Sequence, residues 1–353
     1  MYLIKNVRAP LVPEPDLAGS LAEKFGIERA MIGRILIRRR SLDARKKNQI
    51  GYNFTLLADL PVLAHPDLLP WQEEKPDLEP VHQIHDPHPF IVGTGPAGLF
   101  CALGLVEKGY RPWLFDRGDS LPRRQEKVND FWRKGNLDPE SNVQFGEGGA
   151  GTFSDGKLTA RNRDFYSEKI FDYLVEFGAD PDIRIDALPH LGSDGIRLIV
   201  SRLRAYLEQK GCRFFWNHCL NGIEISHNRI SSILINQTAY KPEILILAVG
   251  NAARDTFVLL SRQIRLDNKP FAVGVRIEHS QDFLNRALYG EKTNLQLTGP
   301  ATYRLTSQCQ GRGVYSFCMC PGGYVIAASS EAEHLVLNGM SFSSRSHSLA
   351  NSA

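Results

Sequence analysis

A glycine-rich segment that follows a short apolar run has the spacing of a phosphate-binding loop. Gly93, Gly95 and Gly98 match the GxGxxG pattern, follow the apolar residues 90–92 and precede a helical pattern. The first glycine permits a tight turn, the second lets the backbone approach a pyrophosphate, and the third lets the helix pack against the strand. Because the helix N-terminus then faces the phosphate charge, the pattern predicts a dinucleotide-binding loop.

A carboxylate follows at the distance where a dinucleotide ribose would lie. Asp116 comes 18 residues after Gly98, at the end of a second predicted strand, and would accept hydrogen bonds from ribose hydroxyls. The glycine pattern alone is weak evidence, since a second match at 146–151 is not followed by a helix. The alternative is a glycine-rich strand-to-helix turn without a ligand. The loop itself does not distinguish FAD from NAD.

Longer motifs along almost the whole chain resemble the poorly characterised FAD-dependent dehydrogenases of bacteria. These motifs are FIVGTGPAGLF (90–100), DRG (116–118), VQFGEGGAGTFSDGKL (143–158), AVGNAARDTF (248–257), FAVGVRIEH (271–279) and FCMCPGG (317–323). The resemblance implies a glutathione-reductase-like FAD domain with an inserted substrate domain. It also implies FAD as cofactor, with hydride transfer from an unknown substrate or from NAD(P)H.

The resemblance assigns cofactor contacts to several parts of the chain. It places the first glycine loop at the FAD pyrophosphate, Asp116 at the ribose, and 146–157 over the ribityl chain and ring. Arg117, Arg123 and Arg124 become candidates for phosphate or flavin contact. The alternative for 146–157 is a flexible surface loop. The expected FAD-binding residues are Gly93, Gly95, Pro96, Ala97, Gly98, Asp116, Arg117, Arg124, Gly148, Gly149, Ala150, Gly151, Thr152 and Gly250.

The resemblance also suggests that the chain is shorter than its family. Family members continue with a segment that completes the flavin pocket, whereas this sequence stops at Ala353 within a family motif. We therefore expect an incomplete FAD site that holds FAD weakly. We also expect an unpaired sheet edge and apolar surface near 349–353, and a tendency to associate.

Cys318 and Cys320 are the main candidates for catalysis. The side chains of residues i and i+2 point to the same face of a strand, so these two thiols would lie together if the segment is extended. They could then form a redox pair or supply a nucleophile near the flavin. The alternative is a pair of reduced structural thiols, and two thiols supply only half of a zinc site. His279 lies in a family motif with Arg276 and Glu278 and is a weaker candidate, because a salt-bridged strand end explains this motif equally well.

Two other clusters carry charge or metal-ligand chemistry. Residues 34–47 hold seven Lys or Arg side chains against one Asp, which is typical either of a nucleic-acid surface or of a solvated hairpin edge. The alternative function is therefore a protein that binds RNA or another polyanion. His82, His85 and His88 recur every three residues in a proline-rich stretch, but no further ligand set accompanies them, and we expect no metal.

The order of predicted elements indicates an α/β protein with a Rossmann-like FAD/NAD(P)-binding domain. We expect a small α+β module (1–60), a proline-rich linker (61–89), the FAD-binding domain (90–267) and a mixed, incomplete substrate domain (268–353). Near-average composition, 42% hydrophobic and 23% charged, excludes a disordered or collagen-like chain. Six sparse cysteines, no secretory signal and no long apolar run predict a cytoplasmic protein without a membrane partner.

Overall fold

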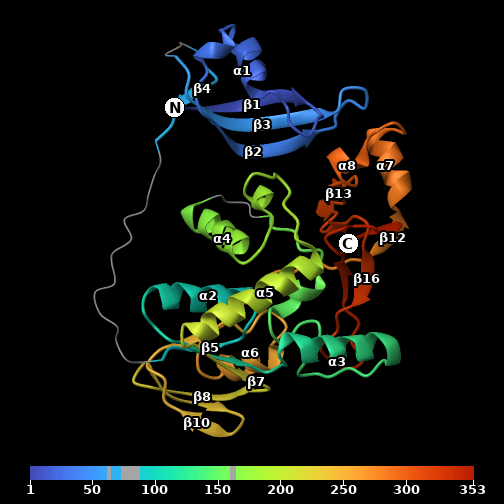
Figure 1. The fold of residues 1–353 in the computed structure, drawn as a ribbon. Coiled ribbons are helices and arrows are strands. Elements are labelled where there is room, and N and C mark those ends of the chain that lie inside the picture. The colour runs from blue at the N-terminus through green and yellow to red at the C-terminus, as the bar shows by residue number, and fades with distance from the viewer. Residues whose placement is uncertain (62–64, 73–87, 160–163) are drawn as a thin grey trace.

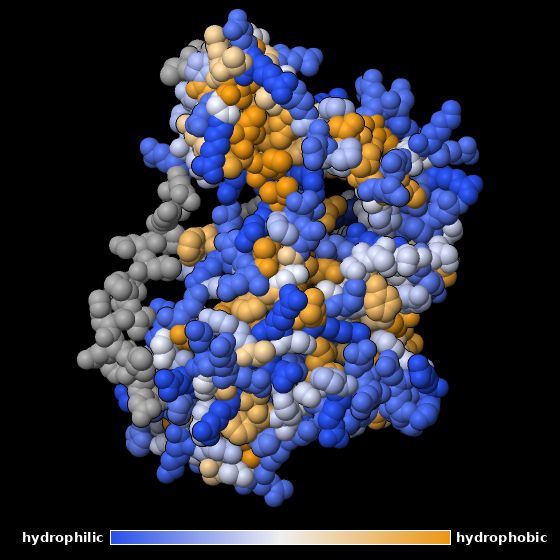
Figure 2. All heavy atoms as spheres, in the orientation of Figure 1, coloured by the Kyte–Doolittle hydropathy of each residue, from blue (hydrophilic) through white to orange (hydrophobic). Residues whose placement is uncertain are grey.

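The computed structural model describes residues 1–61, 65–72, 88–159 and 164–353 (Figure 1). An N-terminal module lies at one end of the molecule and the predicted dinucleotide-binding part at the other, with the C-terminal segment beside both. Figure 2 shows hydrophilic residues over most of this face, with apolar residues gathered on the N-terminal module. Within the described residues, none of the helices combines the length and apolar character that a membrane span requires.

The N-terminal module is an antiparallel sheet covered by one helix. Its elements are β1 (Tyr2–Pro10), α1 (Leu17–Phe25), η1 (Arg29–Met31), β2 (Ile35–Asp43), β3 (Gly51–Ala58) and β4 (Leu68–Pro70). The strand order is β2-β3-β1-β4. Asp16 caps α1 by accepting a hydrogen bond from the Gly19 amide, as its sequence position predicts. Leu21 of this helix is fully buried in the module's core with Phe54.

The module extends beyond residue 60, where we expected a linker. β4 pairs with β1 through Leu68 and Pro70, and Pro70 is tolerated because β4 is an edge strand. The proline count alone did not reveal this short strand. Most of the remaining linker, with His82 and His85, lies outside the described residues, whereas His88 hydrogen-bonds the Arg111 carbonyl and stacks on Trp113.

A parallel sheet forms the centre of the second part, which confirms the Rossmann-like fold. Its order is β11-β5-β6-β7, and all neighbouring strands are parallel. The elements of this part and its crossover region are β5 (Phe90–Val92), α2 (Pro96–Glu107), β6 (Trp113–Asp116), α3 (Leu121–Lys134), η2 (Gly149–Phe153), α4 (Phe165–Glu176), η3 (Pro181–Arg184), α5 (Gly192–Gln209), β7 (Arg213–Trp216), β11 (Leu245–Leu247) and α6 (Arg254–Ser261).

The two faces of this sheet carry different cores. Ile91 and Leu114 pack with α2 and α5 on one face, whereas Phe90 and Phe115 face the other. This alternation follows from the two-residue period of a strand. On the second face lie α6 and an antiparallel sheet of β8 (Leu220–Ser226), β9 (Arg229–Ile235) and β10 (Thr238–Tyr240). Short turns join these three strands into hairpins, so they form a sheet of their own.

The C-terminal segment contains short strands and two helices. Its elements are β12 (Ile277–Ser280), α7 (Gln281–Tyr289), α8 (Leu295–Thr298), β13 (Thr306–Cys309), β14 (Arg312–Tyr315), β15 (Met319–Cys320), β16 (Tyr324–Ala327), β17 (Leu337–Met340) and β18 (Leu349–Ser352). Ile326 and Met340 pack against Val128 of α3. Trp132 of α3 also donates a hydrogen bond to the Ala327 carbonyl.

The expected unpaired edge at 349–353 is wrong. β18 is the middle strand between β12 and β15, and Ala350 and Asn351 are fully buried. The apolar exposure lies elsewhere in this segment, at Phe271 and Val273, which are 89% and 90% exposed. The sequence prediction failed because the partners of β18 lie 31 to 75 residues earlier in the chain.

The basic stretch 34–47 is neither a free surface nor a solvated edge throughout. Arg40 reaches two carboxylates, Asp186 through Nε and Asp182 through Nη2, both at 2.8 Å. The Arg40 amide and carbonyl also pair with residues 185 and 187. Arg38 is ion-paired with Glu168 and Arg45 with Asp43. Part of the positive charge therefore joins the N-terminal module to acidic residues after α4.

We predict that Arg40→Ala loosens this junction. The substitution removes a partly buried pair of ionic hydrogen bonds worth roughly 1 kcal/mol. Hydrogen exchange of the Ala187 amide, which donates to the Arg40 carbonyl, should become about fivefold faster. Arg39→Ala is the matched control, since Arg39 is exposed on the same strand. Equal exchange in both variants would contradict the assigned junction.

Candidate functional site

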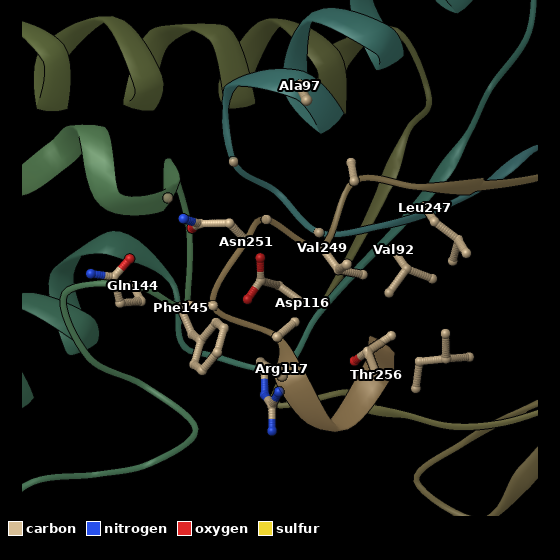
Figure 3. Close-up of a pocket in the computed structure, with 18 of the residues that line it drawn as sticks. Val92, Ala97, Asp116, Arg117, Gln144, Phe145, Leu247, Val249, Asn251 and Thr256 are labelled. Atoms are coloured by element: carbon tan, nitrogen blue, oxygen red, sulfur yellow. The ribbon is translucent and has the colours of Figure 1, made fainter. Parts of the chain in front are cut away.

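A cavity of about 520 Å³ opens at the carboxyl ends of the parallel strands. It lies where β11 and β6 flank β5 on opposite sides, so the chain order reverses at this point of the sheet. Open α/β sheets bind ligands at such a switch point. The lining residues are 92–93, 95–97, 116–117, 144–146, 149–150, 218–220, 247–253, 256–257 and 260. Figure 3 shows many of these side chains around the cavity.

Two of the three glycines in the first loop are required because neighbouring backbone atoms leave no room for a side chain. Gly93 has φ of 105°, and a Cβ there would lie 2.3 Å from the Ala248 carbonyl oxygen. At Gly98 a Cβ would lie 1.9 Å from the Gly93 carbonyl oxygen. Gly98 therefore serves helix–strand packing and does not line the cavity. Gly95 differs, because the nearest heavy atom to its added Cβ would be the Gly149 Cα at 3.7 Å.

The N-terminus of α2 faces this cavity. Gly95 is the N-cap, Pro96 occupies the first turn, and no side chain caps the helix. The first amides of a helix lack intrahelical acceptors and carry a partial positive charge. Gly95, Pro96 and Ala97 all line the cavity. The arrangement suits an anionic ligand group.

Asp116 is the carboxylate at the end of β6. It is 5% exposed and lines the cavity, where Figure 3 shows it pointing toward the interior. Its Oδ2 accepts hydrogen bonds from the amide and hydroxyl of Thr94, and its Oδ1 accepts one from the Gly118 amide. An ionised carboxylate offers about four acceptor positions, so Asp116 fixes the loop and retains capacity for a ligand hydroxyl.

Arg117 lines the cavity, but its guanidinium is already paired. It donates to both carboxylate oxygens of Glu140 and to both of Asp255, at 2.8 to 2.9 Å. The guanidinium also lies over the Phe145 ring, 4.4 Å from the centroid. The predicted phosphate contact by Arg117 therefore lacks support, because the two carboxylates already neutralise its charge. Arg123 instead lies near Asp119, at 3.8 Å.

Arg124 organises the second glycine-rich segment from within the protein. It is fully buried and outside the cavity lining, so the structure gives no support to the predicted direct contact with a phosphate or flavin. Its guanidinium donates to the Thr152 hydroxyl and to the carbonyls of Asn142, Val143, Gly146, Glu147 and Gly149. Burial lowers the pKa of Arg124 from its ordinary value.

The predicted site residues therefore separate into two groups. Gly93, Gly95, Pro96, Ala97, Asp116, Arg117, Gly149, Ala150 and Gly250 line the cavity, whereas Gly98, Arg124, Gly148, Gly151 and Thr152 do not. A Cβ at Gly148 would lie 2.4 Å from the Thr152 Cγ2, so this glycine is required for packing. The sequence reasoning missed Phe145, His218 and Thr256 as lining residues. Phe145 and Thr256 lie within the motifs at 143–158 and 248–257, whereas His218 lies outside all six motifs.

The two candidate thiols lie together outside the cavity lining. The Sγ atoms of Cys318 and Cys320 are 3.7 Å apart, and Lys157 Nζ lies 3.6 and 3.8 Å from them. His279, the third candidate, is separate from them in its contacts: its Nε2 lies 2.9 Å from the Tyr303 hydroxyl. Among the described residues, no cluster of His, Cys, Asp and Glu has the size that a metal ion requires.

We predict that Arg124→Met destabilises the protein strongly. The variant leaves several buried carbonyl groups of 142–149 without a donor, at a cost of about 3 kcal/mol or more. The urea midpoint of unfolding should fall accordingly. Arg123→Met is the control, because the neighbouring Arg123 side chain is 75% exposed and should change stability by less than about 0.5 kcal/mol. Similar midpoints for the two variants would refute the structural role of Arg124.

Comparison with solved structures gives only distant likenesses. The L-amino acid deaminase from Proteus vulgaris shares 12% identity with a TM-score of 0.24, over 51% of this chain and 50% of the deaminase. A 3-ketosteroid dehydrogenase from Rhodococcus jostii shares 12% identity with a TM-score of 0.33, over 50% and 48% of the two chains. The chain thus matches about half the length of each, and these low scores do not transfer either activity.

Sequence comparison is more informative. Residues 270–353 match the family described as FAD-dependent protein, C-terminal domain-like, and residues 6–59 match a domain of unknown function (DUF8436). An uncharacterised protein from Clostridium beijerinckii is 40% identical over 364 residues, which cover 99% of this chain and 68% of the relative. The chain therefore belongs to the family of this Clostridium beijerinckii protein, with a C-terminal part that matches FAD-dependent proteins.

Proposed function

We propose that the protein is an FAD-dependent oxidoreductase that binds FAD in the cavity at the carboxyl ends of β5, β6 and β11. The carrying observation is the cavity of about 520 Å³ at the switch point of the sheet, which Gly95 and Asp116 line and which the uncapped N-terminus of α2 faces. The match of 270–353 to FAD-dependent proteins supports the choice of FAD. A dinucleotide fits this site, because its phosphates need close backbone approach and its ribose needs a carboxylate.

Different residues of the cavity would bind different parts of FAD. Gly95 and the α2 N-terminus would hold the pyrophosphate, and Asp116 would accept the ribose hydroxyls. The apolar side chains of Val92, Leu247 and Val249 lie beside Asp116 in the cavity lining (Figure 3). Because Asp116 would repel a 2′-phosphate, this part of the site favours a nucleotide with a free ribose.

Bound FAD would supply the hydride-accepting chemistry of a dehydrogenase, with NAD(P)H or the substrate itself as reductant. Gly149 and Ala150 would border the bound FAD, since both line the cavity and Gly149 permits close approach of the backbone. The substrate class stays open. A cytoplasmic location is part of this proposal.

The polyanion-binding alternative gains no support from the basic stretch. Arg38, Arg40 and Arg45 already pair with carboxylates of this chain. RNA binding there would have to use the remaining Arg and Lys side chains or break these pairs. Binding of RNA through 34–47 therefore stays a sequence prediction.

We predict that Gly95→Val abolishes FAD binding without unfolding the protein. Gly95 lines the cavity, and a Cβ there would make only an ordinary contact with the Gly149 Cα at 3.7 Å, so the backbone tolerates the substitution while the added methyl groups take up space at the cavity wall that the pyrophosphate needs. We expect at least a hundredfold weaker FAD binding, measured by flavin fluorescence quenching on titration of the protein. Circular dichroism should match wild type. Gly95→Val tests FAD binding more specifically than Asp116→Ala, because Asp116→Ala also removes three hydrogen bonds within the protein.

Gly104→Ala is the matched control within the same helix. No heavy atom lies within 4 Å of a Cβ at Gly104, which is outside the cavity lining. It should bind FAD like wild type and gain about 0.5–1 kcal/mol of stability, because alanine favours the helix. Unchanged FAD affinity in folded Gly95→Val, or no FAD binding by wild type, would refute the assigned site.

A further inference from the structure

Cys318 and Cys320 have unequal environments although they lie side by side. Both are free thiols with their sulfur atoms 3.7 Å apart. Cys318 is partly exposed, whereas Cys320 is fully buried on β15. An accessible sulfur beside a buried one is the arrangement that a dithiol needs to react with an external disulfide. The outer sulfur attacks first, and the inner sulfur completes the reaction.

Positive charge surrounds these two sulfur atoms. Lys157 Nζ lies within hydrogen-bond distance of both sulfurs and 2.8 Å from Asp155. Asp155 also contacts Arg345 at 3.3 Å and lies 3.7 Å from His190. One nearly buried carboxylate is thus shared by Lys157 and Arg345. Its negative charge does not cancel both cations.

A third cation approaches from the strand side. A Cβ added to Gly339 would lie 2.4 Å from Cys320 Sγ and 2.6 Å from Arg276 Nη1, so the sulfur and the guanidinium share one tight space. Within the described residues, the buried Nε atoms of Arg276 and Arg345 and Nδ2 of Asn351 have no hydrogen-bond acceptor. Buried donors in excess favour negative charge nearby.

We propose that Cys318 and Cys320 form a thiol–disulfide exchange pair in which Lys157 stabilises the thiolate of Cys318. The Cys318 thiolate attacks a low-molecular-weight disulfide, forms a mixed disulfide and releases one thiolate. Cys320 gives up its proton to that thiolate and attacks the Cys318 sulfur. The second thiolate then leaves, and it takes a proton from solvent. Overall two protein thiols lose two electrons to the disulfide, and two small thiols form.

The electrostatics of the pair agree with these separate roles. The hydrogen bond with Cys320 lowers the pKa of Cys318, and Lys157 acts in the same direction against the effect of burial. The same hydrogen bond and burial raise the pKa of Cys320. Cys318 is therefore the thiolate that attacks first. As pH falls through the pKa of Cys318, its thiolate and the exchange reaction are lost.

Disulfide closure requires little movement of the backbone. Cys318 lies directly before β15, and its carbonyl accepts a hydrogen bond from the Ala353 amide beside β18. Residues two apart in an extended chain are separated by about 6.4–6.8 Å, within the upper range of Cα distances in disulfides. The sulfurs must approach from 3.7 Å to about 2.05 Å. The exchange needs no bound flavin, so the proposal can be tested separately from FAD binding.

The test uses the full chain, reduced and then treated with oxidised glutathione. Cleavage by trypsin after Arg312 and Arg345 releases one peptide that contains Cys318 and Cys320 and no other cysteine. We expect this peptide to lose two hydrogens in mass as its internal disulfide forms. Cys309, an exposed thiol in the preceding peptide, is the internal control. A reduced 313–345 peptide beside glutathionylated Cys309 would overturn the proposal.

Single variants assign the order of attack. Cys320→Ser should hold one glutathione on Cys318 as a stable mixed disulfide, whereas Cys318→Ser should leave the buried Cys320 unmodified. Matching melting temperatures would exclude unfolding as the cause. The same reactivity in both variants would contradict the assigned roles.

The Lys157 variants test the thiolate. Because the pKa of Cys318 is lowered to about 6, Lys157→Gln should slow iodoacetamide alkylation of Cys318 about twofold at pH 7 and up to about tenfold at pH 5, and should move its pH profile upward, since one pKa unit changes the thiolate fraction up to tenfold. Lys157→Arg keeps the charge and should retain most of the rate. An unchanged alkylation profile in Lys157→Gln would refute the role of Lys157, with Cys309 alkylation as the reference.

Discussion

Five backbone carbonyl groups from residues 142–149 converge on one fully buried guanidinium, that of Arg124. This segment contains glycines with positive φ, so regular secondary structure cannot satisfy its polar groups. A buried charge is costly unless hydrogen bonds replace its hydration, and these carbonyls supply them. These hydrogen bonds hold Phe145 and Gly149 at the wall of the cavity. The chain then continues from this segment to Asp155 and Lys157 near the two thiols. Both proposed chemistries thus depend on one conformation of this segment.

The parts predictable from sequence are those that local chemistry determines. The strand, glycine turn and helix from Phe90 to Glu107 follow from an apolar run, a GxGxxG spacing and helical periodicity. Asp116 was predicted from its spacing, 18 residues after Gly98 at the end of the second predicted strand. Asp16 was identified as a cap from its position before an apolar pattern. Each of these inferences uses residues close together in sequence.

The remaining features depend on partners that are far apart in sequence. Arg117 and Arg124 were predicted as ligand contacts by residue type, yet one meets two carboxylates and the other meets backbone carbonyls. Local sequence does not show which hydrogen-bond acceptors lie next to a guanidinium in the folded protein. The same limit applies to β18, whose partners are β12 and β15, and to Arg40, which pairs with Asp182 and Asp186. Such pairings follow from the tertiary structure.

The path from Gly149 to Lys157 connects two kinds of site within one short segment. Its first residues border the cavity, and its last side chain contacts both thiols. Seven residues after Ala150 span at most about 25 Å, so the connection does not by itself place the thiols against a bound ring. Thiol–disulfide exchange requires an accessible thiolate and a resolving thiol, and neither depends on contact with flavin. The cavity and the thiol pair are therefore chemically independent, although a conformational change in this segment would alter both.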